Sequence, residues 1–432
     1  MHAYTTRIPA LVRPVLIGLC AWTLCAPRTA AAVEAPEAAS AAPLAERLQA
    51  LVEALNEHGV AFDGDAAYET VVASLIKVAD PAGGPQTAAA EEALTRRRAG
   101  TIYDAGLRLH ITNESVRITH IREDTPARET DLEKDSTLLN IDQTDVSGLG
   151  LHRIIRLLRS DANEPVTLTV QTVDGFTLTQ RVDRVETTLP DIESRETLPF
   201  QLAYLHVNRL HEGTGASIAE TISGWAAEKR YGVLLDLRGA DGTDLDSVIA
   251  VGELLAEPGG LLFAYRDKDD QDIHVAHAGD VEPLTLPVMV LVDSETGGAA
   301  EVLAAVLSDS VRGVMVFGQP TRGDMLVRDA VDLSDGSRLY LATRRLVTAD
   351  GTVYTGMDGV RPDVISARID EDASAYKPVR SSRTEVLDEE IEQEKLYNRV
   401  RGDATLRRAV DVLLGLKALD IRPRASNPHH SR

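Results

Sequence analysis

Residues 286–309 read LPVMVLVDSETGGAAEVLAAVLSD, and this stretch decides the fold of the larger part of the chain. Its first eight residues are an apolar run that predicts a buried strand. Residues 294–298 form a turn of small and polar residues, and residues 299–309 predict a helix. A strand with almost no polar residue is typical of a parallel sheet covered on both faces. The stretch therefore indicates one strand–turn–helix unit of an α/β sheet.

The same alternation continues on both sides of this stretch. Further strands are predicted at residues 203–207, 232–237 and 313–317, and further helices at residues 215–229 and 244–256. Because strands and helices alternate along the chain, we expect a mostly buried α/β core over residues 190–370.

The region before this core has a different pattern. Short strands are predicted at VRITHI (116–121), TLLNI (137–141) and VTLTV (166–170), and one amphipathic helix at LHRIIRLLRS (151–160). This order predicts a small β-rich domain over residues 99–186.

The segments on either side of these two regions have patterns of their own. Two patterns of apolar residues at helical spacing predict a helical cap over residues 44–98, interrupted by GGP at 83–85. Residues 371–432 are a charged tail in which residues 406–419 predict an amphipathic helix that docks on the core. Residues 33–43, rich in Ala, Pro and Glu, are expected to be a disordered leader.

The first 32 residues are typical of a secretory signal. Arg7 and Arg13 flank the start of an apolar run at residues 14–26, and three alanines follow at 30–32. The run is shorter than the roughly 20 residues of a stable membrane span. We therefore expect an exported protein, periplasmic or secreted, although a signal kept as an anchor stays an alternative. Both cysteines lie in this segment, so the mature chain is expected to have no disulfide.

The charge of the chain excludes some partners. Lys and Arg total 45 against 67 Asp and Glu, a formal net charge of −22. Nucleic-acid phosphates bind clustered cations. We therefore expect no nucleic-acid partner and no anionic membrane surface as the main target.

Several motifs in order carry a family resemblance. They are GLRL (106–109), DTPA (124–127), LLNID (138–142), GVLLDLRGADGTDLDSV (232–248), the stretch at 286–309 and GVMVFGQPTRGDM (313–325). In this order and spacing, over roughly residues 44–420, the chain resembles the tail-specific (C-terminal processing) peptidases. The resemblance implies an α/β crotonase-like core with an inserted, small β-rich PDZ-like domain and a helical N-terminal cap.

The same resemblance implies a Ser–Lys dyad, because family members are serine-type endopeptidases. A serine hydroxyl needs a base, and a lysine serves only when burial makes it neutral. By the family pattern the nucleophile lies three residues before Glu301, where this chain has Gly298. The lysine position holds Asp324, and Arg328 stands where the family usually has glutamine.

The backbone donors of the oxyanion hole would come from Gly242 and Ala299 by the same match, with Thr243 replacing a second glycine. No lysine occurs between Lys268 and Lys377, and no serine between Ser294 and Ser308. We therefore expect no functional catalytic residue, whichever register is chosen.

Other candidate residues have simpler interpretations. Thr296 is expected to stabilise the turn rather than act as a nucleophile, and Ser308 and Asp309 to end a helix at the surface. His274 and His277 lie on a predicted hairpin, where they would point to opposite faces. We expect no metal site and no cofactor.

Several acidic residues also lie within these motifs. Asp241, Asp244 and Asp246 lack the spacing of a calcium loop and are expected to form a solvated acidic loop. Glu301 and Asp324 are expected to lie near each other, although an acid–base dyad is not the favoured interpretation.

In the PDZ-like segment, Gly106, Leu107, Arg108 and Leu109 are implied to form the peptide-carboxylate loop and the adjoining strand edge. The glycine-rich turn usual after DTPA is replaced by ETDLEKDS (129–136). The alternative is a PDZ fold that serves only as a spacer.

The leading hypothesis is a catalytically inactive homologue that binds polypeptide C-termini, extended peptides or a protein partner. The first alternative is an active serine-type endopeptidase. The second is a structural subunit of an active homologue or a homo-oligomer.

Overall fold

The computed structural model describes residues 41–80, 83–111, 115–149, 151–334, 336–356, 358–366, 394–396, 400 and 403–422. The predicted signal peptide lies outside these residues. The chain divides into two compact units, residues up to Asp63 and residues from Gly64 onward. In the first unit the structure describes helix α1 (Ala41–Glu57). This helix begins inside the segment 33–43 that was expected to be disordered, because its first residues include alanines, the strongest helix formers.

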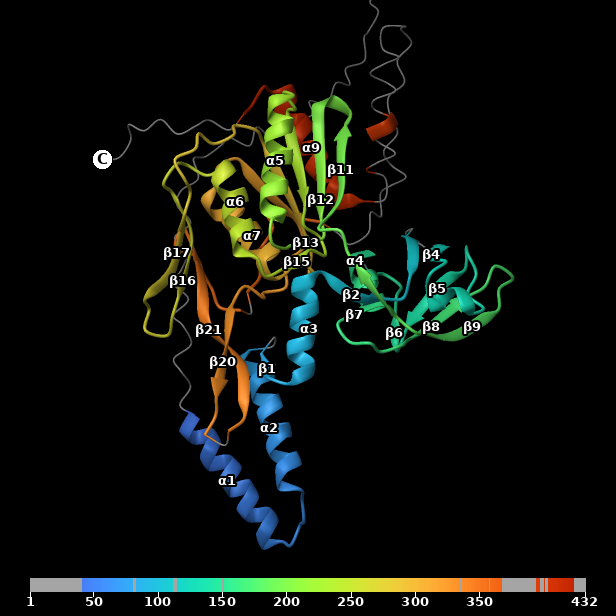
Figure 1. Ribbon diagram of the computed structural model, residues 1–432, viewed down its shortest axis with the longest axis vertical. Helices are drawn as coiled ribbons and strands as arrows, with labels where there is room; N and C mark the ends of the chain where they lie inside the picture. The colour runs from blue at the N-terminus through green and yellow to red at the C-terminus, as the bar shows by residue number, and fades with distance from the viewer. Residues whose placement is uncertain are drawn as a thin grey trace, which may run out of the picture. The chain divides into compact units, whose positions relative to one another are not determined.

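The sheet at the centre of residues 190–370 has six strands in the order β11-β12-β14-β18-β19-β23 (Figure 1). β11 (Ile192–Leu198) is antiparallel to its neighbour, and the parallel strands are β12 (Leu202–Val207), β14 (Gly232–Asp236), β18 (Val288–Val292), β19 (Val314–Gly318) and β23 (Val364–Ile365). The strands predicted from apolar runs are β12, β14, β18 and β19, so the mixed α/β fold expected from the sequence is present.

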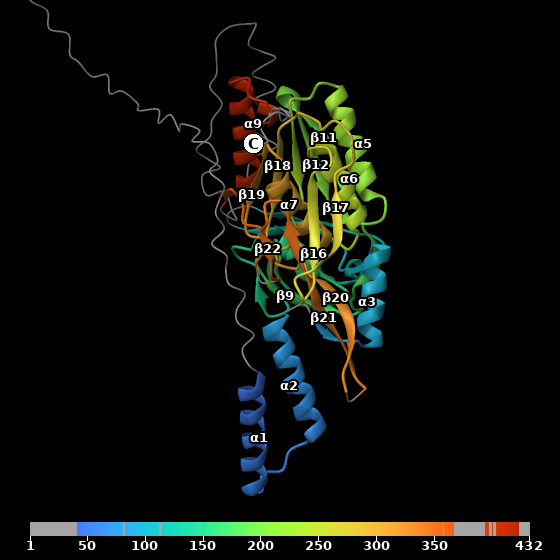
Figure 2. The ribbon, with the colours of Figure 1, turned by 90° about the vertical axis from the view of Figure 1, so that its left-hand side faces the viewer.

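Helices cover both faces of this sheet. Alternate residues such as Leu205, Leu235 and Val290 pack with α5 (Thr214–Ala227), α6 (Leu245–Leu255) and α7 (Gly298–Ser310). The residues between them, such as Tyr204 and Leu234, pack with α9 (Ala404–Ala418) on the opposite face (Figures 1 and 2). The central strand β18 is thus apolar throughout because both of its faces are buried, whereas Ile365 of the edge strand β23 is exposed.

A second six-stranded sheet, of which the sequence predicted only the hairpin around His274 and His277, lies within residues 190–370 apart from β1. It contains β1 (Gly84–Pro85), β16 (Leu261–Arg266), β17 (Asp272–His277), β20 (Val327–Asp332), β21 (Arg338–Thr348) and β22 (Val353–Tyr354), all paired antiparallel. Its strands mix polar and apolar residues, which gave a weaker sequence signal than the apolar runs.

The β-rich region has a hydrophobic core of its own. Its main sheet has the order β3-β4-β5-β8-β9, with β3 (Leu107–Ile111), β4 (Val116–Ile121), β5 (Thr137–Ile141), β8 (Val166–Gln171) and β9 (Thr177–Val182). A smaller sheet joins β10 (Val185–Thr188), β2 (Thr101–Asp104) and β7 (Arg159–Ser160). Helix α4 (Leu151–Leu158) buries Ile154 and Leu158 against Ile118 and Leu168.

The helical cap expected over residues 44–98 differs from the structure in two ways. α1 belongs to the first unit, whereas α2 (Gly64–Ala79) belongs to the second. A further helix, α3 (Ala88–Ala99), was not predicted. Its sequence, AAAEEALTRRRA, consists mainly of strong helix formers without an apolar stripe, so the search for periodicity missed it.

Candidate functional site

The turn between β18 and α7 carries the position that the family resemblance assigns to the nucleophile. Asp293 organises this turn, because its Oδ1 accepts hydrogen bonds from the backbone N–H groups of Gly239 at 2.9 Å, Glu295 at 3.0 Å and Thr296 at 3.1 Å. Asp293 therefore makes hydrogen bonds within the turn and also joins the turn to the loop after β14.

Thr296 is a structural residue of the same turn. Its hydroxyl donates to the Leu237 carbonyl at 2.8 Å and accepts from the Asp293 N–H at 3.0 Å. The side chain is fully buried. These contacts agree with the turn-stabilising interpretation.

Gly298 follows, in a conformation that leaves no room for a side chain. Its φ is +56°, in the left-handed region that favours glycine. A Cβ atom added there would lie 2.3 Å from the Gly242 carbonyl oxygen and 2.7 Å from Asp241 Oδ1. Any larger residue therefore requires the loop that contains Asp241 and Gly242 to move.

Gly242 lies on the short strand β15 (Asp241–Gly242), which pairs with β13 (Arg209–Leu210). Its backbone N–H, one of the two expected oxyanion donors, donates to Asp241 Oδ1 at 2.8 Å. Ala299, which would supply the other donor, lies buried in the first turn of α7. The structure thus places both positions beside Gly298, with the Gly242 N–H engaged by a carboxylate of the same strand.

Arg322 is a site residue that the sequence did not single out. Its Nη1 donates to Asp241 Oδ2 at 3.1 Å, and its Nη2 donates to the Glu295 carbonyl. The guanidinium also lies against Gly297, where an added Cβ would be 2.5 Å from Arg322 Cζ. Arg322 therefore joins the loop after β14 to the turn before α7.

Asp324 and Arg328, the positions of the family's lysine and glutamine, form an ion pair. Arg328 Nη1 lies 2.5 Å from Asp324 Oδ1, and Arg328 Nη2 lies 2.7 Å from Asp80 Oδ1. Asp80 follows α2 and also accepts from the Ala342 N–H at 2.9 Å. The guanidinium and both carboxylates are largely buried, at 16%, 19% and 6% exposure.

Glu301 lies next to Asp324, as the sequence predicted. Its fully buried carboxylate accepts from the Thr321 hydroxyl and from the N–H groups of Gly323 at 2.5 Å and Asp324 at 2.6 Å. Burial raises the pKa of Glu301 to about 6, although these three hydrogen bonds lower it. The contacts hold the turn at residues 321–324 against α7, which is a positioning role.

Two of the minor assignments need correction. Asp309 is not a surface residue, because Oδ2 accepts from the Thr348 and Tyr354 hydroxyls, both at 2.9 Å, and burial raises its pKa. Asp241 and Asp244 are not part of a merely solvated loop either. Asp241 pairs with Arg322, and Asp244 caps α6 by accepting from the Ser247 N–H at 3.0 Å.

The two histidines of β17 show no ligand arrangement. His274 stacks on Phe263, with ring centroids 6.0 Å apart, and His277 Nδ1 lies 3.3 Å from the Gly259 carbonyl oxygen. Within the part of the chain that the structure describes, no group of three or more His, Cys, Asp or Glu residues is arranged to hold a metal ion.

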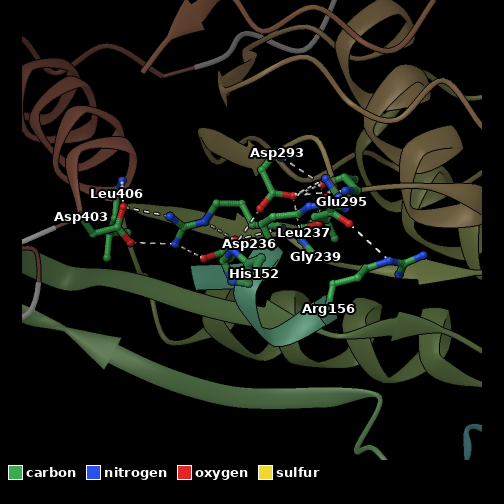
Figure 3. A network of polar contacts seen from close by, with 12 residues as sticks. His152, Arg156, Asp236, Leu237, Gly239, Asp293, Glu295, Asp403 and Leu406 are labelled. Carbon is green, nitrogen blue, oxygen red and sulfur yellow. Dashed lines mark hydrogen bonds and ion pairs between the residues drawn. The ribbon is translucent and has the colours of Figure 1, made fainter. Parts of the chain in front are cut away.

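Helix α4 of the β-rich region contacts the turn before α7 (Figure 3). His152 Nδ1 lies 3.0 Å from Asp293 Oδ2, Arg153 Nη1 lies 3.1 Å from Glu295 Oε1, and Arg156 Nε lies 3.3 Å from Glu295 Oε2. Burial raises the pKa of Asp293, but the contact with His152 and the backbone hydrogen bonds lower it, and the net pKa is lowered.

A second ion-pair network lies behind this contact (Figure 3). Arg238 Nε donates to Asp236 Oδ1 at 2.8 Å, and Nη1 donates to Asp403 Oδ1 at 2.9 Å. Asp236 is fully buried. Although burial raises its pKa, the Arg238 guanidinium holds the pKa of Asp236 well below its usual range. The network connects the end of β14 to the N-terminus of α9.

A cavity of about 400 Å³ lies between α4 and the loops after β12 and β14. Its lining includes Asp241, Gly242 and Glu295, so it adjoins the turn that contains Gly298. No sequence pattern indicates this cavity, since its walls come from segments far apart in the chain.

The residues expected to bind a peptide lie at the edge of the β-rich sheet. Gly106 precedes β3 with φ at +77°, and its N–H donates to Asp104 Oδ1 at 2.6 Å. Leu107 and Leu109 pack partly against the hydrophobic core, and Arg108 between them is exposed. β3 is the edge strand of its sheet and pairs with β4. This loop lies outside the Gly298 turn, so the two sets of predicted residues form separate sites.

Comparison with known proteins gives a family. Residues 201–366 match the model described as peptidase family S41. Over 293 residues the chain is 28% identical to the chloroplastic C-terminal processing peptidase of Tetradesmus obliquus, covering 63% of this chain and 62% of that protein. Over 250 residues it is 24% identical to the carboxy-terminal processing protease CtpA of Bacillus subtilis, covering 56% of this chain and 51% of that protein.

These alignments span about half to three fifths of the relatives' own length. Among solved structures, the chain is similar to a photosystem II D1 C-terminal processing protease with 23% identity and a TM-score of 0.48, covering 80% of this chain and 89% of that one. Among the described residues, no helix has the length and apolar character needed to cross a membrane.

Proposed function

We propose that this chain, whose residues 201–366 match peptidase family S41, binds polypeptide segments or a protein partner outside the cytoplasm without cutting them. The family relationship supports a polypeptide as the ligand, since the relatives are named as C-terminal processing peptidases.

The geometry of Gly298 is the observation that carries the proposal. A hydroxyl nucleophile at this position would need a Cβ, and the nearest atoms to such a Cβ are a backbone oxygen and a carboxylate at 2.3 and 2.7 Å. Hydrogen bonds also engage the neighbouring Thr296 hydroxyl with Leu237 and Asp293. Neither residue thus offers an activated nucleophile.

The position of the base supports the same conclusion. Asp324 is an acceptor paired with Arg328, and a carboxylate in an ion pair is a poor base for a hydroxyl. The expected oxyanion donor of Gly242 already donates to Asp241, so a developing negative charge there would meet a carboxylate rather than a free N–H.

We assign peptide binding to a PDZ-like domain over residues 99–186, inserted before a crotonase-like core at residues 190–370. The Ala105 N–H donates to the Leu158 carbonyl at 3.3 Å, which brings the loop before β3 to the end of α4. An edge strand beside a helix is the arrangement that receives an added peptide strand. The backbone N–H groups of Leu107 to Leu109 would hold the peptide's C-terminal carboxylate, since the Gly106 N–H already donates to Asp104 Oδ1.

The remaining assignments follow from the sequence. A signal peptide at residues 1–32 would direct the chain to the periplasm or the medium. The leader predicted at residues 33–43 would follow it, with α1 beginning at Ala41. The helical cap at residues 44–98 and the tail at 371–432 complete the domain scheme. An active homologue or a second copy of the chain is a further candidate partner.

An assay of proteolysis tests the proposal directly. The mature protein should not cleave casein and should not react with a serine-directed fluorophosphonate, whereas an active family member run in parallel does both. Loss of a nucleophile in a serine enzyme lowers turnover by on the order of 10⁶-fold. Covalent labelling of any residue at 294–308, or cleavage that Thr296→Ala abolishes, would falsify the proposal.

The family match itself favours a second candidate, an active serine-type endopeptidase. Casein cleavage above the background of a mock purification would establish it. A third candidate, a structural subunit of an active homologue, predicts that the chain co-purifies with that homologue from its host and binds no free peptide.

A further inference from the structure

The outer face of strands β3 and β4, beside the edge proposed to receive a peptide, is basic. The two strands together contain Arg108, His110, Arg117 and His120, and neither contains an Asp or a Glu. All four side chains are exposed, whereas the apolar residues between them pack toward the hydrophobic core of the β-rich region. The neighbouring strand β5 has no charged residue. This basic face therefore stands out in a chain whose formal net charge is −22.

The register of the two strands brings these four side chains together. Arg108 is directly opposite His120, and His110 is directly opposite Arg117. Directly opposed residues of an antiparallel pair share one face of the sheet, with Cβ atoms roughly 4.5–5.5 Å apart, and opposite charges at such positions stabilise the sheet. Neither pair here contains a carboxylate. The sheet therefore gains no ion pair from these residues, which favours a role in binding a ligand.

The protein does not neutralise the basic face from elsewhere. The four side chains make no ion pair and no hydrogen bond with any residue that the structure describes. The two carboxylates that follow β4 in the chain are paired with other arginines, Asp124 with Arg122 and Glu123 with Arg128. The guanidinium and imidazole groups of the basic face are therefore available to an acceptor from outside the chain.

A peptide that pairs with β3 would direct every second side chain to the basic face. β3 is the edge strand of its sheet, so an extended peptide can add to its free side. Successive side chains of a strand point to opposite faces. When the C-terminal residue of the peptide lies on the side of Leu107 and Leu109, the penultimate residue lies on the side of Arg108 and His110. Arg117 is only one strand farther, at a strand spacing of roughly 4.8 Å.

We propose that the basic face selects polypeptides that have an acidic residue, Asp or Glu, immediately before an apolar C-terminal residue. A guanidinium binds a carboxylate through two parallel N–H donors, and an imidazole can add a further N–H donor. The inference rests on the proposed binding of a peptide C-terminus by the backbone of Leu107 to Leu109, and it adds the chemical class of the peptide.

Three matched peptides test this preference on the full chain. They share an apolar free C-terminus and differ only in the penultimate residue, which is Glu, Gln or Lys. In fluorescence polarisation at low salt, the Glu peptide should bind about fivefold more tightly than the Gln peptide, the upper range for one exposed ion pair. The Lys peptide should bind more weakly than both. Raising the salt to about 0.5 M should reduce these differences, because salt screens exposed charges.

Two variants locate the preference. Arg108→Gln combined with Arg117→Gln should make the Glu and Gln peptides bind equally, while the affinity for the Gln peptide, which shows that the variant is folded, stays nearly unchanged. Arg181→Gln is the control, because Arg181 is an exposed arginine of β9 at the opposite edge of the same sheet. It should keep the fivefold difference. A preference for Glu that survives the double variant would overturn the assignment to the basic face.

The same titrations separate this inference from the proposed function. If the Glu and Gln peptides bind the parent chain equally, the acidic preference is wrong and the peptide site stands. If no peptide binds, the proposed peptide site fails, and the basic face loses its peptide ligand with it. Binding to phosphatidylglycerol vesicles that the double variant abolishes, without any preference for the Glu peptide, would overturn the proposal in favour of an anionic surface.

Discussion

The turn before α7 and the loop before β3 are the two places where the family resemblance predicts contact with a polypeptide, and they differ in what surrounds them. At the turn, the protein's own groups occupy the space: Arg322 bridges Asp241 and Glu295, and no side chain fits at Gly298. At the loop, Gly106 precedes the edge strand β3, and the side chains of Leu107 and Leu109 are only partly buried.

On the proposed function, this chain keeps the recognition of a polypeptide and lacks the chemistry. The ion pairs of Arg322 and Arg328 connect the loops around Gly298 and Asp324, whereas a strand edge needs only its backbone to bind a peptide. Variants that loosen the turn should therefore affect stability, and changes to a ligand's C-terminus should affect binding alone.

The largest effect is expected from the buried ion pair. Arg328→Met leaves the Asp324 and Asp80 carboxylates without their shared cation and should lower the free energy of unfolding by about 3–5 kcal/mol. Arg338→Met, on the next strand of the same hairpin, breaks an exposed pair with Asp332 and should leave the free energy of unfolding nearly unchanged. Denaturant unfolding of both variants measures the contrast, and equal losses would mean that the turn is not held by this pair.

A side chain at the Gly298 position should have the next largest effect. Gly298→Ser forces a Cβ against Gly242 and should destabilise the protein by on the order of 3 kcal/mol. Gly224→Ser, on α5 with no atom within 4 Å of the added Cβ, is the control.

The double variant Gly298→Ser with Asp324→Lys should fold poorly and should not cleave casein, because a misplacement of about 1 Å costs roughly 10²-fold in rate. Turnover near about 10 s⁻¹, typical of enzymes, would show that the turn can still accommodate the dyad.

A smaller effect, dependent on pH, is expected at Glu301. Burial raises its pKa to about 6, above the ordinary value of 4.5, so the native state binds this proton more tightly than the unfolded state. The stability that this proton provides is present below about pH 4.5 and is lost as the pH rises through 6. Between pH 4 and 7 the parent chain should lose about 2 kcal/mol relative to Glu301→Gln. Parallel pH profiles of the two proteins would exclude a raised pKa.

The smallest effect is expected at the peptide loop. An extended peptide with an apolar free C-terminus should bind the full chain weakly, and its amidated form should bind about tenfold more weakly, a difference of about 1.4 kcal/mol. Amidation removes the charge that the loop recognises. Equal affinities measured by fluorescence polarisation would leave the β-rich domain as a spacer.

Much of the core was predictable because its strands are buried on both faces. Unbroken apolar runs such as GVLLDL and VMVLV identify β14 and β18 without any knowledge of their neighbours. The polar strands β20 and β21 were missed for the converse reason, since a mixed pattern does not by itself distinguish a hairpin from a loop. Helix α3 escaped because it lacks an apolar stripe.

The sequence by itself determined which groups the chain lacks: no serine between Ser294 and Ser308 and no lysine between Lys268 and Lys377, statements that hold in any fold. The contacts made by the residues around Gly298 and Asp324 come from the tertiary structure alone. Arg322 reaches Asp241 across 81 residues of sequence, and Arg328 reaches Asp80 across 248. Ion pairs of this kind depend on distances between side chains that are remote in the chain, and spacing along the sequence does not contain those distances.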